Sequence, residues 1–394
     1  MHPERLGRLS PPSIRHEGKH TLSANFNHDE ISRLDFQMIY GFYLAQNIFP
    51  GTKLSWKNIQ KNKFKKNFNR LPKSRIEIRS IMKKDSMWQM WSSLKRINQE
   101  INFYIRGEVI SRQEENIKKK FNYLLKKNKK HKKFLKIKTN FKVPVYINRV
   151  DIHCMPGGYN SDQGKGLFSG SNYDTASLYL ATGGELGKWN DGAGWANILF
   201  LKENFNKLNP SSILDLGCSV GHSTLPLKEY WPKAKVFAID SCAPLLRFAY
   251  GRSQSLKKNI YFFQQNAEKT EFPDESFDII TSSMFMHEIP QKNLKLIGKE
   301  IYRLLKPGGI MLHNEQPQYH NQPPIEQFLR EWDTWFNNEP MRCAFRDMDL
   351  RYWVKNSGFC INNFSMKISD GANKISNKLV STKNGSWFIL AAQK

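Results

Sequence analysis

The stretch Ile213-Leu214-Asp215-Leu216-Gly217-Cys218-Ser219-Val220-Gly221-His222-Ser223-Thr224 decides the fold. It begins as an apolar strand, turns through small residues and continues into a helix. Small residues let the backbone approach a ligand closely, and the amides at the start of a helix can receive a carboxylate. The sequence therefore predicts a ligand-binding loop between a strand and a helix.

The next apolar segment ends in an acidic residue, Asp240, which lies 25 residues after Asp215. An acid at the end of a second strand suits a bidentate contact with the hydroxyls of a ribose. Dinucleotides and S-adenosylmethionine are both bound by this arrangement. The dinucleotide fingerprint needs glycine at the first, third and sixth places of the loop, and only the first place, Gly217, is glycine here.

Beyond this loop, apolar segments alternate with helical patterns up to the C-terminus. Seven segments are predicted as strands: 213–217, 235–240, 260–263, 277–282, 310–314, 359–366 and 387–391. Strand and helix alternation at this spacing implies a largely parallel sheet covered on both faces. We expect an α/β fold with a seven-stranded, mostly parallel sheet and helices on both faces, plus an N-terminal, mainly helical domain.

The N-terminal half has a different pattern. Residues 1–28 show no periodicity and predict an irregular or disordered leader, whereas 29–150 predict a basic, mainly helical domain. Residues 151–210, rich in Gly, Tyr and Asp, predict a junction and cap segment before a ligand-binding domain over 211–394. Within the helical domain, we expect a loop over 53–73 and a solvated helix end or linker over 126–138.

Charge is concentrated in the N-terminal region. The chain carries 61 Lys and Arg against 35 Asp and Glu, and residues 1–150 hold 34 of the basic residues and 11 of the acidic ones. Such asymmetry suits a nucleic acid or an anionic membrane surface, and a Lys-rich helical domain with solvated charges is the alternative.

Other classes of protein are disfavoured by composition. No apolar run approaches the roughly 20 residues that cross a bilayer, and the N-terminus lacks a signal-peptide pattern. We therefore expect no membrane span and a cytoplasmic location. Five widely spaced cysteines without a CxxC pair indicate neither a disulfide framework nor a metal site.

Over about 211–394 the sequence resembles the class I S-adenosylmethionine-dependent methyltransferases, especially the branch that includes ubiquinone and menaquinone biosynthesis enzymes. The segment 215–221 is similar to the glycine loop of that family, although Ser219 stands where its middle glycine is usual. Asp240 matches the ribose-binding acid. Three further segments match in order: Asn266-Ala267-Glu268, 272–278 and 304–309. The resemblance implies a Rossmann-like fold and S-adenosyl-L-methionine as cofactor.

The resemblance also implies roles for single residues. Gly217 and Gly221 would line the methionine end of the cofactor, Asp240 would hold the ribose, and Asn266 and Ala267 would meet the adenine. Ser282 and Ser283 would face the sulfonium. The expected cofactor-binding residues are Asp215, Gly217, Ser219, Gly221, Asp240, Asn266, Ala267, Ser282 and Ser283. For Asp215, a role confined to fixing the loop is the alternative.

Methyl transfer gains most of its rate from orientation in a dry pocket, and a general base is needed only when the acceptor must lose a proton. His287 and Glu288, just after the fourth strand, are the candidate catalytic residues. A structural role is the alternative for His287. Lesser candidates are His153, His313, Glu315, Tyr319 and His320.

Two aromatic segments are candidate covers of the pocket. The segment 316–353 contains Trp332, Trp335, Phe336, Phe345 and Trp353, and the junction contains Tyr159, Tyr173, Tyr179 and Trp189. Aromatic residues at helical spacing are also common in packing contacts.

The leading functional hypothesis is a methyltransferase for a small-molecule acceptor, since the segment 282–288 lacks the Asn-Pro-Pro-Tyr and Pro-Cys motifs of nucleic-acid or protein methylation. An RNA- or ribosome-directed methyltransferase anchored by the basic domain is the second hypothesis. A non-catalytic binding protein that retains the fold is a third, and an NAD-dependent oxidoreductase is more distant. Oligomeric state is not indicated.

Overall fold

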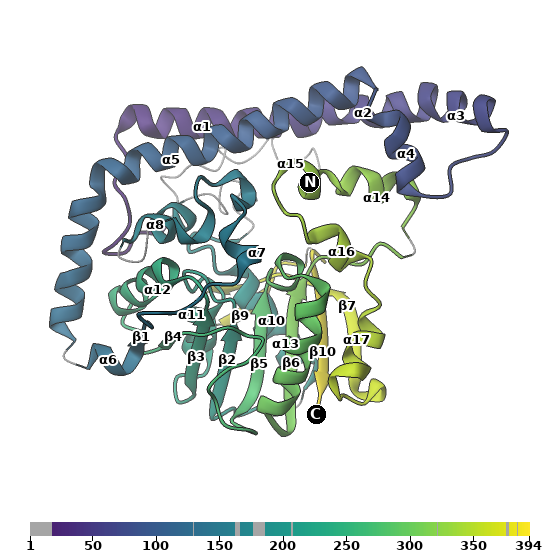
Figure 1. Cartoon of the computed structure of the whole chain (residues 1–394). Helices are drawn as coiled ribbons and strands as arrows, with labels where there is room; N and C mark the ends of the chain where they lie inside the picture. Colours follow the sequence, from purple (N-terminus) through teal and green to yellow (C-terminus); the bar gives the residue numbers. More distant parts are fainter. Residues whose placement is uncertain are drawn as a thin grey trace.

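The computed structural model describes residues 18–128, 130–161, 166–175, 186–205, 208–320, 322–375, 378–383 and 385–394. A layer of N-terminal helices lies across the top of a sheet flanked by helices (Figure 1). No helix among the described residues is both long enough and apolar enough to cross a membrane.

The central sheet contains eight strands in the described ranges. In spatial order they are β1 (Leu135–Lys136), β4 (Tyr261–Gln264), β3 (Lys235–Asp240), β2 (Ser212–Leu216), β5 (Phe277–Ser283), β6 (Leu305–Glu315), β10 (Trp387–Gln393) and β7 (Phe364–Ser369). β10 is antiparallel to both of its neighbours, and the other pairs are parallel. The predicted mostly parallel sheet is confirmed. β1, which comes from the expected linker, adds an eighth strand at the edge.

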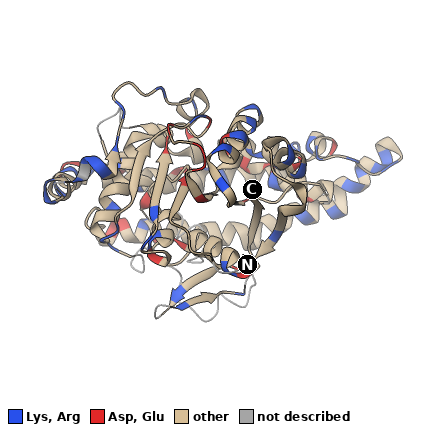
Figure 2. Ribbon diagram, turned by 90° about the horizontal axis from the view of Figure 1, so that it is seen from below, with Lys and Arg blue, Asp and Glu red and all other residues tan. Residues whose placement is uncertain are grey.

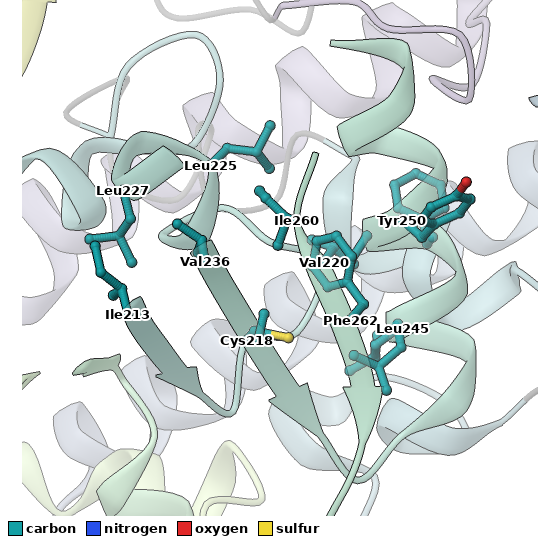
Figure 3. Close-up of a cluster of buried hydrophobic side chains, with 14 of the residues drawn as sticks. Ile213, Cys218, Val220, Leu225, Leu227, Val236, Leu245, Tyr250, Ile260 and Phe262 are labelled. Atoms are coloured by element: carbon teal, nitrogen blue, oxygen red, sulfur yellow. The ribbon is translucent and has the colours of Figure 1, made fainter. Parts of the chain in front are cut away.

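Helices cover both faces of the sheet, because alternate residues of each strand point to opposite sides. On one face, Ile213 and Val236 pack in a core with α10 (Gly192–Asn204), α11 (Thr224–Tyr230) and α12 (Ala243–Ser255); Figure 3 shows part of this core. On the other face, Leu214 and Leu216 pack with α13 (Gln291–Leu304) and α17 (Leu350–Ser357). Because β2, β3, β4 and β5 are parallel, their carboxyl ends meet at one edge of the sheet. From β2 the chain order runs through β3 to β4 on one side and through β5 to β6 on the other. Ligands gather at such a point in open α/β sheets.

The N-terminal helical layer is nearly continuous. Its elements are α1 (His28–Tyr43), η3 (Leu44–Ile48), α2 (Phe49–Ser55), η4 (Trp56–Gln60), α3 (Lys61–Phe68), α4 (Arg75–Met82) and α5 (Ser86–Lys127). The expectation of a loop over 53–73 was wrong for most of that segment. Its Lys and Asn residues are solvated on helices, and buried Trp56 and Phe64 anchor the inner face.

Local signals start the two long helices. Asn27 and Glu30 form a capping box at α1, in which the Asn27 side chain accepts from the Glu30 amide and the Glu30 carboxylate accepts from the Asn27 amide. Asp85 caps α5 by accepting from the amide of Trp88 at 2.9 Å. Lys and Arg recur along this layer and at both of its outer ends (Figure 2).

Helix α5 is 42 residues long and packs against both halves of the chain. Val109, Ile110, Phe121 and Leu124 belong to the same core as Phe248 and Tyr250 of α12. The helical layer and the sheet thus share one hydrophobic core. The domain boundaries drawn from the sequence stay a prediction.

The remaining elements of the described residues are short. These are α6 (His131–Phe134), α7 (Val145–Asn148), η5 (Ile152–Cys154), η6 (Gly158–Asn160), α8 (Phe168–Asp174), η7 (Met286–Glu288), α14 (Pro324–Arg330), α15 (Trp332–Phe336), α16 (Arg342–Arg346), η8 (Ile361–Asn363), and a hairpin of β8 (Ala372–Ile375) and β9 (Lys378–Ser381). α8 approaches α12 closely at Gly170, where a Cβ atom would lie 2.4 Å from the Cβ of Phe248. This contact fixes α8 beside the carboxyl edge of the sheet.

The predicted leader is irregular over residues 18–27, and it is packed rather than free. Leu22 is fully buried, and its Cδ1 lies against Gly251 of α12. Thr21 bonds to Ser255 through both its amide and its hydroxyl. Residues 1–17 lie outside the described residues.

Candidate functional site

A cavity of about 300 Å³ lies at the carboxyl ends of β2, β3, β4 and β5. The junction covers it from the N-terminal side, and the segment 316–353, called the cap from here on, contributes Gln316 and Arg342. Lining residues used below are His153, Tyr159, Tyr173, Asp215, Gly217, Ser219, His222, Asp240, Asn266, Ala267, Ser283, His287 and Glu288.

The glycine loop is held in a left-handed conformation at three places. The φ angles are 62° at Gly217, 47° at Ser219 and 82° at Gly221. A Cβ atom on Gly217 would lie 2.2 Å from a ring carbon of Phe285, so this position excludes a side chain. Ser219 adopts the conformation that a glycine would adopt there, and its buried hydroxyl has no partner among the described residues. The serine therefore keeps the turn and adds a polar group to the loop.

Asp240 is fixed beside this loop. Its Oδ2 accepts from the amide of Ser219 and its Oδ1 from the amide of Cys242, each at 2.9 Å. Each carboxylate oxygen has a second acceptor site, so the group can still receive ligand hydroxyls. Burial raises the pKa of Asp240 to about 6.

Asp215 is fully buried beneath the loop and accepts from the hydroxyl of Thr224 at 2.5 Å. Burial raises its pKa to about 7. This bond ties the end of β2 to the first residue of α11. Asp215 therefore shapes the loop as well as touching the cavity.

The ends of β4 and β5 complete the cofactor side of the cavity. Asn266 and Ala267 line it, and the Asn266 side chain accepts from the amide of Glu268 at 2.9 Å. Ser283 lines it and accepts from the Asn197 amide group at 3.0 Å.

Ser282 does not line the cavity, because alternate strand residues face opposite ways. Its hydroxyl lies 2.7 Å from Nδ1 of buried His313 instead. The expectation that Ser282 faces the sulfonium is therefore corrected. Burial lowers the pKa of His313 to about 4.

The cavity is also bordered by an acid–histidine cluster, formed by His153, His287, Glu288, Glu315 and Glu339, of which the first three line it. Nδ1 of His287 lies 2.7 Å from Glu315, and its Nε2 lies 3.7 Å from Glu339. Burial lowers the pKa of His287, but the two carboxylates outweigh burial and raise it. The two acids therefore favour the protonated form of His287, which makes the ring a poorer proton acceptor than a free imidazole.

Glu288 faces the cavity from the same short element. The Tyr159 hydroxyl donates to Glu288 Oε1 at 2.8 Å, and His153 Nε2 lies 3.5 Å from that oxygen. His153 Nδ1 lies 3.3 Å from Glu339. Burial lowers the pKa of His153, but Glu339 and Glu288 outweigh burial and raise it to about 10.

The cap closes this cluster with two residues that the sequence analysis missed, Glu339 and Arg342. Arg342 Nη1 lies 2.5 Å from Glu339, and Asn337 donates to Glu339 at 2.7 Å. Three cationic neighbours, of which Arg342 acts most strongly, hold the pKa of Glu339 well below its usual range against the effect of burial. No motif marks either residue, since both reach the site from a segment without periodicity.

A row of rings lines the junction side. The ring centroids are 6.2 Å apart from His153 to Tyr159, 5.6 Å from Tyr159 to Tyr173, and 6.1 Å from Tyr173 to His222. Tyr159 and Tyr173 therefore cover the cavity, as the sequence predicted. Trp189 does not line it, and Tyr179 lies outside the described residues.

Tyr173 is followed by Asp174, at which three segments meet. Asp174 lies 2.8 Å from His20 of the leader, 2.8 Å from His222 of the glycine loop and 3.2 Å from Arg252 of α12. Burial raises the pKa of Asp174, but these partners outweigh burial and hold it well below its usual range. The leader is thus connected to a cavity residue through one carboxylate.

The remaining candidates lie elsewhere. Tyr319 is buried beside Cys343, and His320 is exposed outside the cavity. The cap aromatics do not cover the cavity either. Trp332, Trp335 and Phe336 lie by α4 and α5, and Phe345 and Trp353 pack in the core beneath the sheet.

Residues 213–309 match the model of a family described as "Methyltransferase domain". This segment is therefore similar to a methyltransferase domain. The match covers the glycine loop, Asp240, Asn266 and the element that carries His287 and Glu288. Within the described residues of this domain and its surroundings, no group of three or more His, Cys, Asp and Glu is arranged to hold a metal ion.

Known proteins resemble this domain but have different acceptors. Demethylmenaquinone methyltransferase of Lactococcus lactis is 34% identical over 129 residues, which is 32% of this chain and 49% of that protein. tRNA N(3)-methylcytidine methyltransferase Mettl2 of Drosophila melanogaster is 32% identical over 118 residues, which is 28% of this chain and 36% of that protein. The chain thus spans half or less of the length of these two relatives.

A solved structure, phosphoethanolamine N-methyltransferase 2 of Haemonchus contortus in complex with S-adenosyl-L-methionine, aligns at 17% identity with a TM-score of 0.38. The alignment covers 50% of this chain and 52% of that one.

Proposed function

We propose that the protein is an S-adenosylmethionine-dependent methyltransferase that acts on a small-molecule acceptor, with Glu288 as the group that removes a proton from it. The observation that carries this proposal is one cavity that is lined both by Asp240, the last residue of β3, where we place the cofactor, and by Glu288, where we place the acceptor. The matched segment contains both residues.

The cofactor end fits an adenosyl amino acid. Asp240 would accept from the ribose hydroxyls, because backbone amides already orient its carboxylate. The unpartnered hydroxyl of Ser219 and the backbone of Gly217, which lines the cavity, offer contacts to the amino acid end, and Asn266 and Ala267 lie where the base would pack. When bound, the cofactor supplies a methyl group on a positively charged sulfur.

Tyr159 and Tyr173 exclude water from the cavity, and their rings suit a neighbouring cation. Glu288 is oriented by the Tyr159 hydroxyl and lies beside cationic His153. A proton taken from the acceptor would rest on a Glu288 oxygen. His287 would help to position the cluster rather than take the proton, because its Nδ1 pairs with Glu315.

Calorimetric titration of the full chain with S-adenosylhomocysteine tests the cofactor end. We expect binding that Asp240→Ala weakens by about 1.5–3 kcal/mol, the scale for hydrogen bonds to a charged group. NAD serves as the control ligand. Binding of NAD in place of S-adenosylhomocysteine would refute the proposal, and binding of neither would favour a non-catalytic protein that retains the fold.

The base is tested by turnover with an acceptor found in a panel of small molecules, read as release of S-adenosylhomocysteine. Glu288→Gln should lower turnover by about 10²–10⁴-fold with nearly unchanged cofactor affinity. A matched change at an exposed acid of the same domain, Glu275→Gln, should leave turnover unaltered. Full activity of Glu288→Gln would remove Glu288 from the chemistry.

An RNA- or ribosome-directed methyltransferase is the second candidate, and the distribution of lysines favours it. Helix α3 carries four lysines and no acid, and residues 118–138 carry eleven lysines and no acid. A steep fall in RNA affinity of the full chain with rising salt, reduced by Lys→Gln changes in α3, would support this candidate over the first.

A further inference from the structure

A second cavity of about 480 Å³ lies between the N-terminal helices and the cap, away from the methyltransferase site. Helices α4 and α5 form one wall, and α14 and α15 form the other. None of the described residues that line this cavity lines the first one. The two cavities are therefore separate sites.

Aromatic rings dominate the lining of this second cavity. Trp88 lies 5.5 Å from both Phe328 and Phe336, measured between ring centroids. Trp335 is 56% exposed at the rim, although a large apolar side chain is usually covered. The cavity thus offers flat apolar walls with an open side.

The indole N–H groups of this cavity are not equally satisfied. Trp332 donates to Ser92 at 2.9 Å, and Trp335 donates to Glu331 at 3.3 Å. Trp88 is 7% exposed, and its Nε1 has no hydrogen-bond partner among the described residues. Buried donors are normally paired, so an acceptor is missing beside Trp88.

Positive charge stands at the rim. Arg79 stacks over the Trp335 ring at 4.8 Å and pairs with Glu331. Lys83 also lines the cavity and is exposed, and no carboxylate among the described residues pairs with it. The one acid in the lining, Glu331, is already bound by Arg75 and Arg79.

We propose that this cavity is a second ligand-binding site, for a planar aromatic group that carries an anionic substituent. The aromatic ring packs between Trp88 and Trp335. The anionic substituent accepts from Trp88 Nε1 and lies within the field of Lys83. This site does not depend on the proposed methyl transfer.

The position of the cavity connects it to the acid–histidine cluster. Helix α15 supplies Trp332 and Phe336 to the cavity, and the next residue, Asn337, donates to Glu339. A ligand that shifts α15 would therefore move a residue of the cluster.

The test uses 1-naphthoate as the probe and calorimetry on the full chain. We expect saturable 1:1 binding, with the neutral 1-naphthamide at least tenfold weaker. Trp88→Phe keeps an aromatic ring, although a smaller one, and removes the donor, so it should weaken naphthoate binding about tenfold and leave naphthamide binding less affected. Trp231→Phe, at the end of α11 and outside the cavity, is the matched control and should bind as the parent does.

Trp335→Ala provides a variant that preserves the core, because this side chain is mostly exposed. It should also lower naphthoate affinity about tenfold while the melting temperature stays near that of the parent. Absence of naphthoate binding would overturn the proposal. Equal affinity in the parent and in both Trp88→Phe and Trp335→Ala would place the probe elsewhere and overturn it as well.

Discussion

Replacing His20 by Ala should weaken cofactor binding, although His20 does not line the cofactor cavity. The His20 side chain is 2% exposed and bonds to Asp174 at 2.8 Å, and Asp174 in turn holds His222 of the glycine loop. A hydrogen bond to a charged group contributes about 1.5–3 kcal/mol, so the unfolding free energy should fall by at least that amount. Tyr173, the residue before Asp174, and His222, its partner, both line the cavity, so part of the lost free energy should appear as weaker cofactor binding.

We expect a three- to tenfold loss of affinity for S-adenosylhomocysteine, which corresponds to about 0.7–1.4 kcal/mol. Calorimetry measures affinity, and urea unfolding of the same preparation measures stability. The matched control is Thr21→Ala, which removes an exposed hydrogen bond to Ser255 from the neighbouring leader residue. If the two variants bind the cofactor equally well, the leader does not support the cavity and the reasoning fails.

The same contact predicts a pH dependence. The folded pKa of Asp174 lies well below its unfolded value near 3.9, so its contribution to stability is complete above that value and is lost as pH falls. The melting temperature of the parent should therefore drop more steeply below about pH 4 than that of Asp174→Asn. If the melting temperatures of the two proteins fall equally with pH, Asp174 does not provide this pH dependence.

Two further predictions concern the glycine loop. The pKa of Asp240 is about 6, and its ionised form is the better acceptor for ligand hydroxyls. The affinity for S-adenosylhomocysteine should therefore fall as pH drops through 6. If Asp240→Asn shows the same fall, Asp240 does not have this role. Gly217→Ala should cost about 2–3 kcal/mol in urea unfolding, because its Cβ would overlap Phe285. Gly308→Ala, also at positive φ but in open space, should cost only about 1–2 kcal/mol, and equal losses would show that backbone strain alone matters.

The parts of the structure that could be predicted from the sequence are those formed by segments that follow one another directly in the chain. The loop from Asp215 to Gly221 and the acid at Asp240 could be found because strand, turn and helix follow one another directly. Ser219 departs from the family pattern, and its backbone could not be predicted; its φ of 47° shows that the turn is kept. The mostly parallel sheet followed from the same local alternation.

Contacts between remote segments could not be predicted in this way. His153, Glu288 and Glu339 meet from the junction, the end of β5 and the cap, and no spacing in the sequence relates them. The Lys- and Asn-rich segment around α3 looked like a loop because only Phe64 of that helix is buried. The prediction for Ser282 was wrong because adjacent residues of β5 point to opposite sides, so that Ser283 rather than Ser282 lines the cavity.

The shared core of α5 and α12 has a consequence for synthesis on the ribosome. Val109 and Phe121 emerge well before Phe248 and Tyr250, which belong to the same core. The nascent N-terminal half must therefore keep an apolar helix face uncovered while the glycine loop and β3 are still being made. Apolar surface exposed during synthesis favours aggregation, so this helix face is vulnerable until α12 has been made.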